Sequence, residues 1–233
     1  MRPTGGSKPV VALLGRGLVG SKLPCMTSDV EAAYSHRAAD YTERFGTMST
    51  VHPSDVELVA RWAQEIHGPL LHAGCGPGHW TSFLAQNGND VCGVDLVADF
   101  ISHARETYPQ VPFEVGNVDA LTQASGAVGG VLAWYSLIHH DPGSIQLALR
   151  EFARVLRPGG GLLLGFFIGP EVKPFDHTVA TAYWWSAEAI SEELRIAGFQ
   201  VIESHSRTGF QPKPRPHGAI LARLVTDLLL FSR

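Results

Sequence analysis

A glycine-rich turn between two apolar runs constrains the fold of this chain more than any other segment. The turn Gly74-Cys75-Gly76-Pro77-Gly78 follows Leu70-Leu71-His72-Ala73, and the second apolar run ends at Asp95. This order predicts a strand, a turn whose backbone N–H groups approach a ligand, a helix, and a second strand that ends in an acid. Asp95 follows Gly74 by 21 residues, so one such unit fits and the acid can accept hydrogen bonds from both ribose hydroxyls. The segment therefore predicts a site for a nucleoside-containing cofactor.

The spacing of the glycines argues against a nicotinamide dinucleotide. The dinucleotide fingerprint G-x-G-x-x-G/A needs glycine or alanine at the position where this chain has His79. An oxidoreductase that uses a nicotinamide is therefore only a weak alternative.

The N-terminal residues contain a second glycine pattern, which we interpret as a false match. Gly15-Arg16-Gly17-Leu18-Val19-Gly20 follows an apolar run and fits the dinucleotide fingerprint. Pro24 follows so soon that no helix can form after these glycines. We therefore expect residues 1–28 to be a mostly disordered extension, with Met26 as a candidate true start and a docked edge strand as the alternative.

The composition fits one soluble α/β domain. The chain has 233 residues, of which 45% are hydrophobic and 17% charged, and its net charge of −4 gives no sign of a nucleic-acid partner. Cys25, Cys75 and Cys92 form no CxxC pair, which argues against a disulfide framework or a zinc cluster and favours the reducing cytoplasm. No apolar run approaches the ~20 residues that span a bilayer. We expect a cytoplasmic monomer or homodimer that binds no membrane and no metal.

Three segments beyond the glycine turn carry a resemblance to a known family. They are Phe113-Glu114-Val115-Gly116-Asn117-Val118-Asp119-Ala120-Leu121, Val131-Leu132-Ala133-Trp134-Tyr135-Ser136-Leu137-Ile138-His139-His140 and Leu156-Arg157-Pro158-Gly159-Gly160-Gly161-Leu162-Leu163-Leu164. Together with the glycine turn, they resemble the class I S-adenosylmethionine-dependent methyltransferases in order and spacing. The resemblance covers roughly residues 29–223. It implies S-adenosylmethionine as the cofactor, S-adenosylhomocysteine as the product, and methyl transfer to a small-molecule acceptor.

The resemblance also implies which residues bind the cofactor. Asp95 would hold the ribose, and Asn117 stands where the family usually places an acid against the adenine amino group. The full expected set is Tyr34, Gly74, Cys75, Gly76, Gly78, Asp95, Leu96, Asn117, Val118 and Tyr135. One departure is His72, which replaces the aspartate that usually helps to hold the methionine amino group. Its ring can accept a hydrogen bond from a ligand, or it can be a strand residue satisfied by a backbone carbonyl.

His139 and His140 at the exit of the fourth expected strand are the candidate catalytic residues. Imidazole titrates near neutral pH, so either ring could take a proton from a hydroxyl or an amine. A base is optional because the methyl group of a sulfonium is already activated and needs mainly alignment and exclusion of water. The alternative is that each histidine hydrogen-bonds the backbone or lines the cofactor site.

Alternating apolar strands and amphipathic helices predict a doubly wound, Rossmann-like sheet of seven mostly parallel strands in one domain. We expect a helical lid over residues 29–68, a cofactor-binding domain over 69–223 and a C-terminal tail over 224–233. Strands are expected near 69–73, 90–95, 112–116, 129–135, 161–168, 199–205 and 217–223. Helices are expected near 79–87, 97–106, 143–156 and 186–196.

Two helices are expected to form the lid. The first carries Tyr34 and Tyr41 at helical spacing between Val30 and Phe45, and the second begins at a capping box, Ser54-Asp55-Val56-Glu57. The resemblance implies that the first helix folds over the cofactor. Aromatic residues at helical spacing also commonly face a core, so core packing is the alternative for both tyrosines.

The segment between the fifth expected strand and the last helix is a candidate substrate cap. Tyr183 and Trp184 suit a flat or apolar acceptor, and ligands of open α/β sheets bind outside the carboxyl ends of the strands. The alternative is that these side chains pack against the sheet. A binding protein that holds S-adenosylmethionine without turnover is the rival function from a different class.

Overall fold

A mixed nine-stranded sheet forms the centre of the computed structural model, which describes residues 26–208 and 215–225. One path across the sheet runs β3-β2-β1-β4-β5-β7-β6, and β9 pairs with both β5 and β8. The pairings from β3 to β5 and from β5 to β7 are parallel, whereas those involving β6, β8 and β9 with their neighbours are antiparallel. The strands are β1 Leu70–Ala73, β2 Val91–Asp95, β3 Phe113–Val115, β4 Val128–Trp134, β5 Leu156–Ile168, β6 Lys173–Phe175, β7 Ala182–Trp185, β8 Phe199–Thr208 and β9 Pro216–Leu224.

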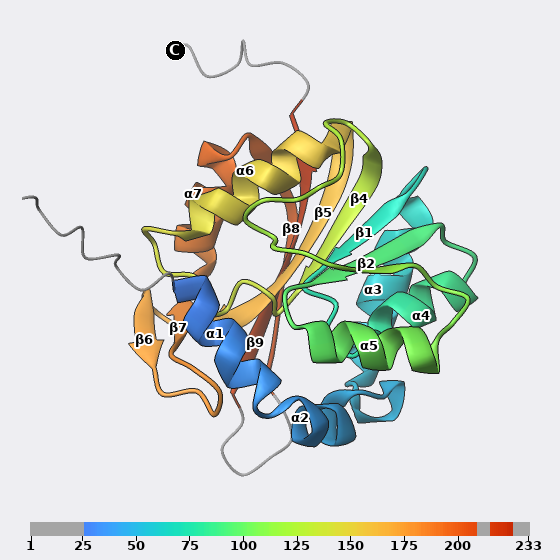
Figure 1. The fold of residues 1–233 in the computed structure, drawn as a ribbon. Coiled ribbons are helices and arrows are strands. Elements are labelled where there is room, and N and C mark those ends of the chain that lie inside the picture. The colour runs from blue at the N-terminus through green and yellow to red at the C-terminus, as the bar shows by residue number, and fades with distance from the viewer. Residues whose placement is uncertain (1–25, 209–214, 226–233) are drawn as a thin grey trace, which may run out of the picture.

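Helices cover both faces of this sheet (Figure 1). In that view α6 and α7 lie on one side, and α3, α4 and α5 lie on the other, while α1 lies in front of the lower part of the sheet and α2 lies below it. The helices are α1 Met26–Ser35, α2 Ala38–Phe45, the 3₁₀ turn η1 Met48–Thr50, α3 Pro53–Glu65, α4 His79–Gln86, α5 Ala98–Thr107, α6 Ile145–Val155 and α7 Ala187–Ile196. The expected doubly wound, mostly parallel architecture is confirmed.

The core divides between the two faces because successive strand residues point to opposite sides. Leu71 and Ala73 join the apolar cluster that includes Ile145 and Phe152 of α6. Leu70 joins the cluster on the other face with residues of α3 and α4. Strands β1 and β4 lie at the middle of the sheet and are covered on both faces. This explains why their residues are almost all apolar.

The expected count of seven strands is wrong, because β6 and β7 add two short strands. β7 extends the parallel pairing at the end of β5, where Phe167 pairs with Trp184, and β6 pairs with β7. The strands have three and four residues, and Pro174 lies within β6. Strands this short carry too little alternation to be recognised from sequence. The fifth strand also begins earlier than expected, at Leu156.

The N-terminal boundary also differs from the expectation. Helix α1 begins at Met26, inside the segment expected to be an extension, and a break at residues 36–37 divides the expected first lid helix in two. The glycine pattern at residues 15–20 lies outside the described residues. The predicted capping box is wrong as well, because the side chain of His52 accepts the hydrogen bond from the Ser54 N–H and Pro53 opens helix α3.

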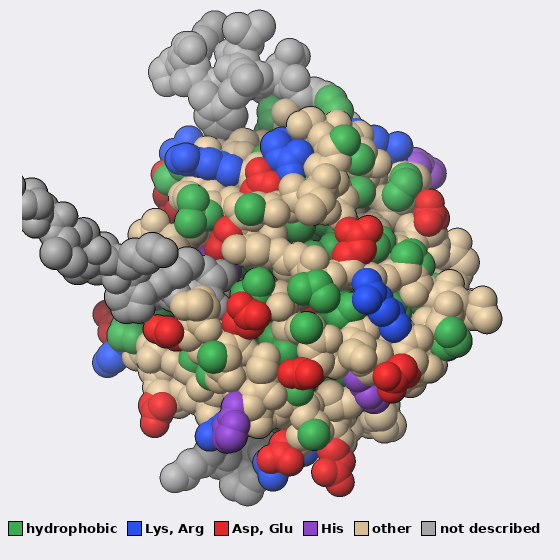
Figure 2. Space-filling model, viewed as in Figure 1, with side chains coloured by type: hydrophobic (Ala, Val, Ile, Leu, Met, Phe, Trp, Pro, Cys, Tyr) green, Lys and Arg blue, Asp and Glu red, His purple; other side chains and the backbone are tan. Residues whose placement is uncertain are grey.

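The molecular surface carries mixed charge on the face in Figure 2, where acidic and basic side chains are interspersed. Residues 26–208 and 215–225 contain no helix long and apolar enough to span a bilayer. That same part of the chain contains no group of three or more His, Cys, Asp or Glu side chains placed to hold a metal ion.

Candidate functional site

A cavity of about 1210 Å³ opens at the carboxyl ends of β1, β2, β4 and β5, under helices α1 and α2. Its volume exceeds the roughly 300–1,000 Å³ typical of a site for one drug-sized ligand, so it has room for two small ligands at once. Most of the residues expected from sequence meet here: Tyr34, Gly74, Cys75, Gly76, Asp95, Leu96, Asn117, Val118, Tyr135, His139 and His140. Gly78, Tyr183 and Trp184 are not among its lining residues.

The glycine turn presents open backbone to the cavity at Gly76. Its φ of +53° lies in the left-handed region, and a Cβ built there would meet nothing within 4 Å. At Gly74, by contrast, a Cβ would lie 2.2 Å from the Cβ of Ser136, so that glycine is required for packing against the exit of β4. The space beside Gly76 is where a ligand can approach the backbone closely.

Gly78 serves the helix that follows the turn and does not line the cavity. It adopts φ +90° as the N-cap of α4. A Cβ there would lie 2.8 Å from Ala104 and 2.9 Å from the ring of Phe113. Close packing of α4 against α5 and β3 therefore accounts for this glycine.

Asp95 links the turn to the end of β2. Its carboxylate accepts hydrogen bonds from the backbone N–H groups of Gly76, at 2.7 Å, and Val97, at 2.9 Å. Burial raises the pKa of Asp95, and these backbone hydrogen bonds oppose the rise because they favour the charged form. Each carboxylate oxygen keeps a second lone pair, which allows the group to accept hydrogen bonds from a ribose as well.

Asn117 follows β3 and forms a turn with its own backbone. Its Oδ1 accepts a hydrogen bond from the Asp119 N–H at 2.9 Å. One lone pair of that oxygen and the whole NH₂ group remain for a ligand. Val118, the next residue, also lines the cavity.

His72 hydrogen-bonds a side chain, which neither expectation for this residue included. Its Nδ1 lies 2.8 Å from Oγ1 of Thr81 on helix α4, and both residues are buried. Burial lowers the pKa of His72 to about 3, so the ring is neutral at pH 7. His72 also lines the cavity and can offer only the hydrogen-bonding capacity of a neutral imidazole there.

His139 has both ring nitrogens engaged. Nδ1 lies 2.8 Å from the carbonyl oxygen of Thr181, so it must donate, and Nε2 then accepts from the Tyr34 hydroxyl at 3.0 Å. Burial is the main cause that lowers the pKa of His139. In this arrangement the Tyr34 hydroxyl already donates to Nε2, the nitrogen that would have to accept a proton from the substrate.

His140 is held by a different partner. Its Nε2 lies 2.9 Å from Oδ1 of Asp119, and its Nδ1 is buried without a hydrogen-bond partner among the described residues. His139 therefore presents no free ring nitrogen to the cavity, whereas His140, which also lines it, keeps an unpartnered Nδ1. The geometry of His139 matches the alternative in which the ring builds the site, and the role of His140 as a base stays a prediction.

A second polar group of side chains at the cavity comprises Asp55, Tyr135, Arg207 and His217, of which the sequence predicted only Tyr135 as a site residue. Arg207 makes a two-pronged ion pair with Asp55, in which Nε to Oδ1 is 2.6 Å. The Tyr135 hydroxyl lies 2.7 Å from Nδ1 of His217. Tyr135 has φ +58° and is the one non-glycine residue with positive φ in the described part of the chain. Strained backbone of this kind gathers at functional sites.

Tyr183 and Trp184 instead stabilise the short strands beside the cavity. Trp184 stacks on Phe175 with ring centroids 4.5 Å apart, and the backbone N–H of Tyr183 donates to the Ile138 carbonyl at 2.8 Å. The residues of this region that do line the cavity are Phe167, His177 and Thr178.

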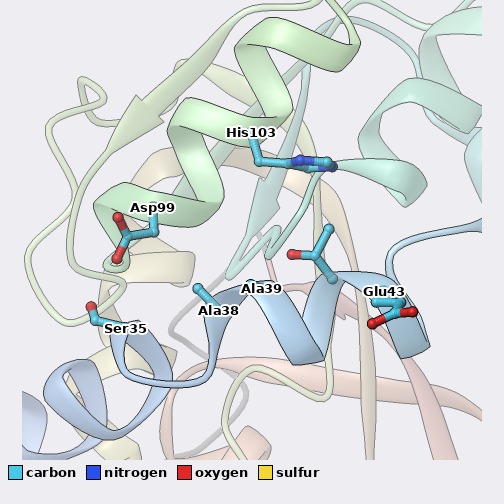
Figure 3. Close-up of a pocket in the computed structure, with 7 residues that line it drawn as sticks. Ser35, Ala38, Ala39, Glu43, Asp99 and His103 are labelled. Carbon is cyan, nitrogen blue, oxygen red and sulfur yellow. The ribbon is translucent and has the colours of Figure 1, made fainter.

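A separate hollow of about 620 Å³ lies between α2 and α5 (Figure 3). Asp99 and His103 project into it from α5, and Ser35, Ala38, Ala39 and Glu43 approach it from the lid. It contains none of the residues expected to bind the cofactor.

Comparisons with known proteins agree with this geometry. Residues 70–160 match the family described as a methyltransferase domain. The chain is 30% identical over 140 residues to the malonyl-(acyl-carrier protein) O-methyltransferase of Enterobacter lignolyticus, which covers 60% of this chain and 54% of that protein. It is 24% identical over 127 residues to the ubiquinone biosynthesis O-methyltransferase of Hydrogenovibrio crunogenus, and this match covers 52% of each chain. The chain spans about half the length of the curated relatives that it matches.

Solved structures share the fold over most of the chain. The 1,6-didemethyltoxoflavin-N1-methyltransferase of Burkholderia thailandensis, solved with S-adenosylhomocysteine and 1,6-didemethyltoxoflavin bound, has a TM-score of 0.69 at 20% identity and covers 93% of this chain and 94% of its own. The 4+2 cyclase SpnF has a TM-score of 0.73 at 18% identity and covers 88% of this chain and 98% of its own. A cyclase on the same architecture shows that the fold by itself does not decide the reaction.

Proposed function

We propose that this chain, whose residues 70–160 belong to the methyltransferase domain family, transfers the methyl group of S-adenosylmethionine to a small-molecule acceptor. The observation that carries the proposal is the open backbone of Gly76 held 2.7 Å from the carboxylate of Asp95 at the edge of a large cavity. This pair offers close backbone approach and a ribose-binding acid in one place.

When bound, S-adenosylmethionine supplies an already activated methyl group. The chain then has to bind the cofactor and the acceptor, orient them for transfer, and exclude water from the site. Asp95 would accept hydrogen bonds from the ribose hydroxyls, Asn117 and Val118 would bind the adenine, and the open space at Gly76 would let the ligand approach the backbone. Tyr34, anchored to His139 at 3.0 Å, covers the site from α1. His72 hydrogen-bonds the methionine part as a neutral group.

The acceptor is a small molecule or a small group carried on a protein. The curated relatives are named O-methyltransferases of malonyl-(acyl-carrier protein) and of ubiquinone biosynthesis. These names favour oxygen as the methylated atom. The toxoflavin neighbour is named for transfer to a ring nitrogen, so nitrogen is the alternative. The lid over residues 29–68 and the cytoplasmic location stay predictions.

Calorimetry with S-adenosylhomocysteine tests the cofactor site. Wild-type protein is expected to bind it in preference to NADH. Asp95→Asn is expected to weaken binding about 10-fold or more, because one charge-assisted acceptor for the ribose is lost. Asp90→Asn, at the exposed position directly before the same strand, is the matched control and should bind as wild type does. Equal affinity of Asp95→Asn and wild type would contradict the ribose assignment.

Transfer of a labelled methyl group to a panel of small acids, phenols and amines tests the activity. Formation of a methylated product supports the proposal that the chain is a methyltransferase. Tight S-adenosylhomocysteine binding with no transfer to any member of the panel would favour the non-catalytic binding protein.

A further inference from the structure

The end of the cavity beyond the glycine turn is walled by aromatic rings. Tyr135 and Phe167 have ring centroids 5.4 Å apart, and Phe167 lies 5.8 Å from His217 and 6.0 Å from His177. All four residues line the cavity. Tyr135 follows β4 directly, Phe167 and His217 belong to β5 and β9, and His177 follows β6, so four separate parts of the chain converge on one aromatic surface.

The polar groups in this wall are neutral or already neutralised. Burial raises the pKa of Tyr135, so its hydroxyl stays protonated and donates to Nδ1 of His217. The pKa of His217 is lowered to about 4, mainly by burial, and its single proton then resides on Nε2. The charge of Arg207 is balanced by Asp55. These groups can hydrogen-bond a ligand but add no net charge.

Arg215 is the exception, because it brings an unbalanced positive charge to this wall. Its guanidinium carbon lies 5.7 Å from the ring centroid of Phe167 and 5.2 Å from that of Phe175. The residue is exposed, lines the cavity and makes no ion pair with any acid in the described residues. The other acids that line the cavity are Glu31 on the lid, Asp95 beside the turn, and Asp119, which holds His140.

We propose that the methyl acceptor is an aromatic anion, whose flat ring lies against Phe167 and Tyr135 and whose carboxylate pairs with Arg215. Edge-to-face and offset contacts favour a planar ring among these side chains. The guanidinium offers a carboxylate two parallel hydrogen bonds and full charge complementarity. The Nε2–H of His217 is a further donor for an oxygen of the acceptor. This inference rests on the proposed function, since it names the substrate class of the same site.

Calorimetry on the complex with S-adenosylhomocysteine tests the substrate class, using three probes. They are 2-naphthoate, 2-naphthamide, which keeps the ring and loses the charge, and octanoate, which keeps the charge and loses the ring. We expect 2-naphthoate to bind about 10-fold or more tightly than either of the others. Comparable binding of the amide or of octanoate would overturn the proposal, as would no binding of 2-naphthoate.

Two arginine variants locate the effect. Arg215→Gln should remove the preference for 2-naphthoate over 2-naphthamide while leaving S-adenosylhomocysteine binding unchanged. Arg223→Gln, an exposed arginine at the far end of β9, is the matched control and should keep the preference. A preference that survives Arg215→Gln would show that another group recognises the anion. Failure to bind S-adenosylhomocysteine would instead contradict the proposed function, so the two failures are distinguishable.

Discussion

The two ends of the cavity are built in different ways. At the cofactor end, Gly74, Gly76, Asp95 and Val97 lie within one strand-turn-helix-strand unit, and their contacts join residues 2 and 19 positions apart. At the acceptor end, Tyr135 meets His217 across 82 residues, and Asp55 meets Arg207 across 152. A short motif specifies the first end, whereas the second exists only after the whole sheet has formed.

The substitution with the largest expected effect is Gly76→Val, which disrupts binding at the cofactor end alone. Gly76→Val places a branched side chain in the space beside Asp95, so S-adenosylhomocysteine affinity should fall by at least about 100-fold. Calorimetry measures the loss, and circular dichroism checks that the fold persists.

Gly88→Val is the matched control for backbone strain. Gly88 also has positive φ, at +87°, and open space around it, but it lies outside the cavity. This variant should therefore share the strain and keep the affinity. If both variants lose binding equally, strain and not ligand space explains the glycine.

The comparison also explains how much of the structure could be predicted from the sequence. Strands β1 to β4 and helices α4 to α7 were expected within a few residues of their bounds, because each has strong apolar periodicity and a turn residue at its end. The β6–β7 pair was missed because three- and four-residue strands carry no such pattern. The break between α1 and α2 was missed because the tyrosine spacing runs through it.

The site residues divide in the same way. Gly76 and Asp95 meet as expected, because the motif encodes both the turn and the acid that holds it. The glycine spacing predicted that Gly78 also binds the cofactor. Its neighbours are instead Ala104 of α5 and Phe113 of β3, which are distant in the sequence. The Asp55–Arg207 pair leaves no local signal, since each residue alone looks like an ordinary surface charge.

Removal of the ion pair between Asp55 and Arg207 is expected to destabilise the acceptor end. The side chains of Arg207 and Asp55 are 22% and 11% exposed. Asp55→Ala leaves the arginine charge largely buried without its partner, so the free energy of unfolding should fall by about 2 kcal/mol. Urea unfolding measures the change. Asp55→Leu combined with Arg207→Met should recover most of the loss, because an apolar pair leaves no unpaired charge.

The exposed pair between Arg61 and Glu203 provides the comparison. Its side chains are 49% and 37% exposed, so solvent screens the attraction. Arg61→Ala should therefore lower the free energy of unfolding much less than Asp55→Ala does. Equal losses from the buried and the exposed pair would mean that Asp55 and Arg207 contribute nothing special to the acceptor end.

A smaller effect at the cofactor end is a dependence of stability on pH. The pKa of His72 is about 3 in the folded chain and near 6.5 when exposed. Between these values the unfolded chain binds a proton that the folded chain does not. Stability is therefore fully present above about pH 6.5 and falls as the pH drops, by at most about 1.4 kcal/mol per pH unit.

Urea unfolding of wild type and His72→Asn between pH 5 and 8 checks this slope. The variant should show a shallower dependence between pH 5 and 6.5, whereas His36→Asn, at an exposed position between α1 and α2, should keep the wild-type slope. Identical slopes for all three proteins would mean that His72 takes up its proton in the folded state.

The smallest expected effect concerns the lid that joins the two ends. Tyr34 reaches His139 with its hydroxyl at 3.0 Å, but its ring also lies 5.6 Å from Tyr41 and 6.0 Å from Phe100. Tyr34→Phe removes only the hydrogen bond, so the amides of α1 should exchange with solvent about 5-fold faster, which corresponds to about 1 kcal/mol. Tyr41→Phe, which keeps the ring in the same aromatic group, should leave that rate unchanged. An unchanged rate in Tyr34→Phe would show that ring packing alone holds α1 over the cavity, and that His139 is freed at little cost when a substrate binds.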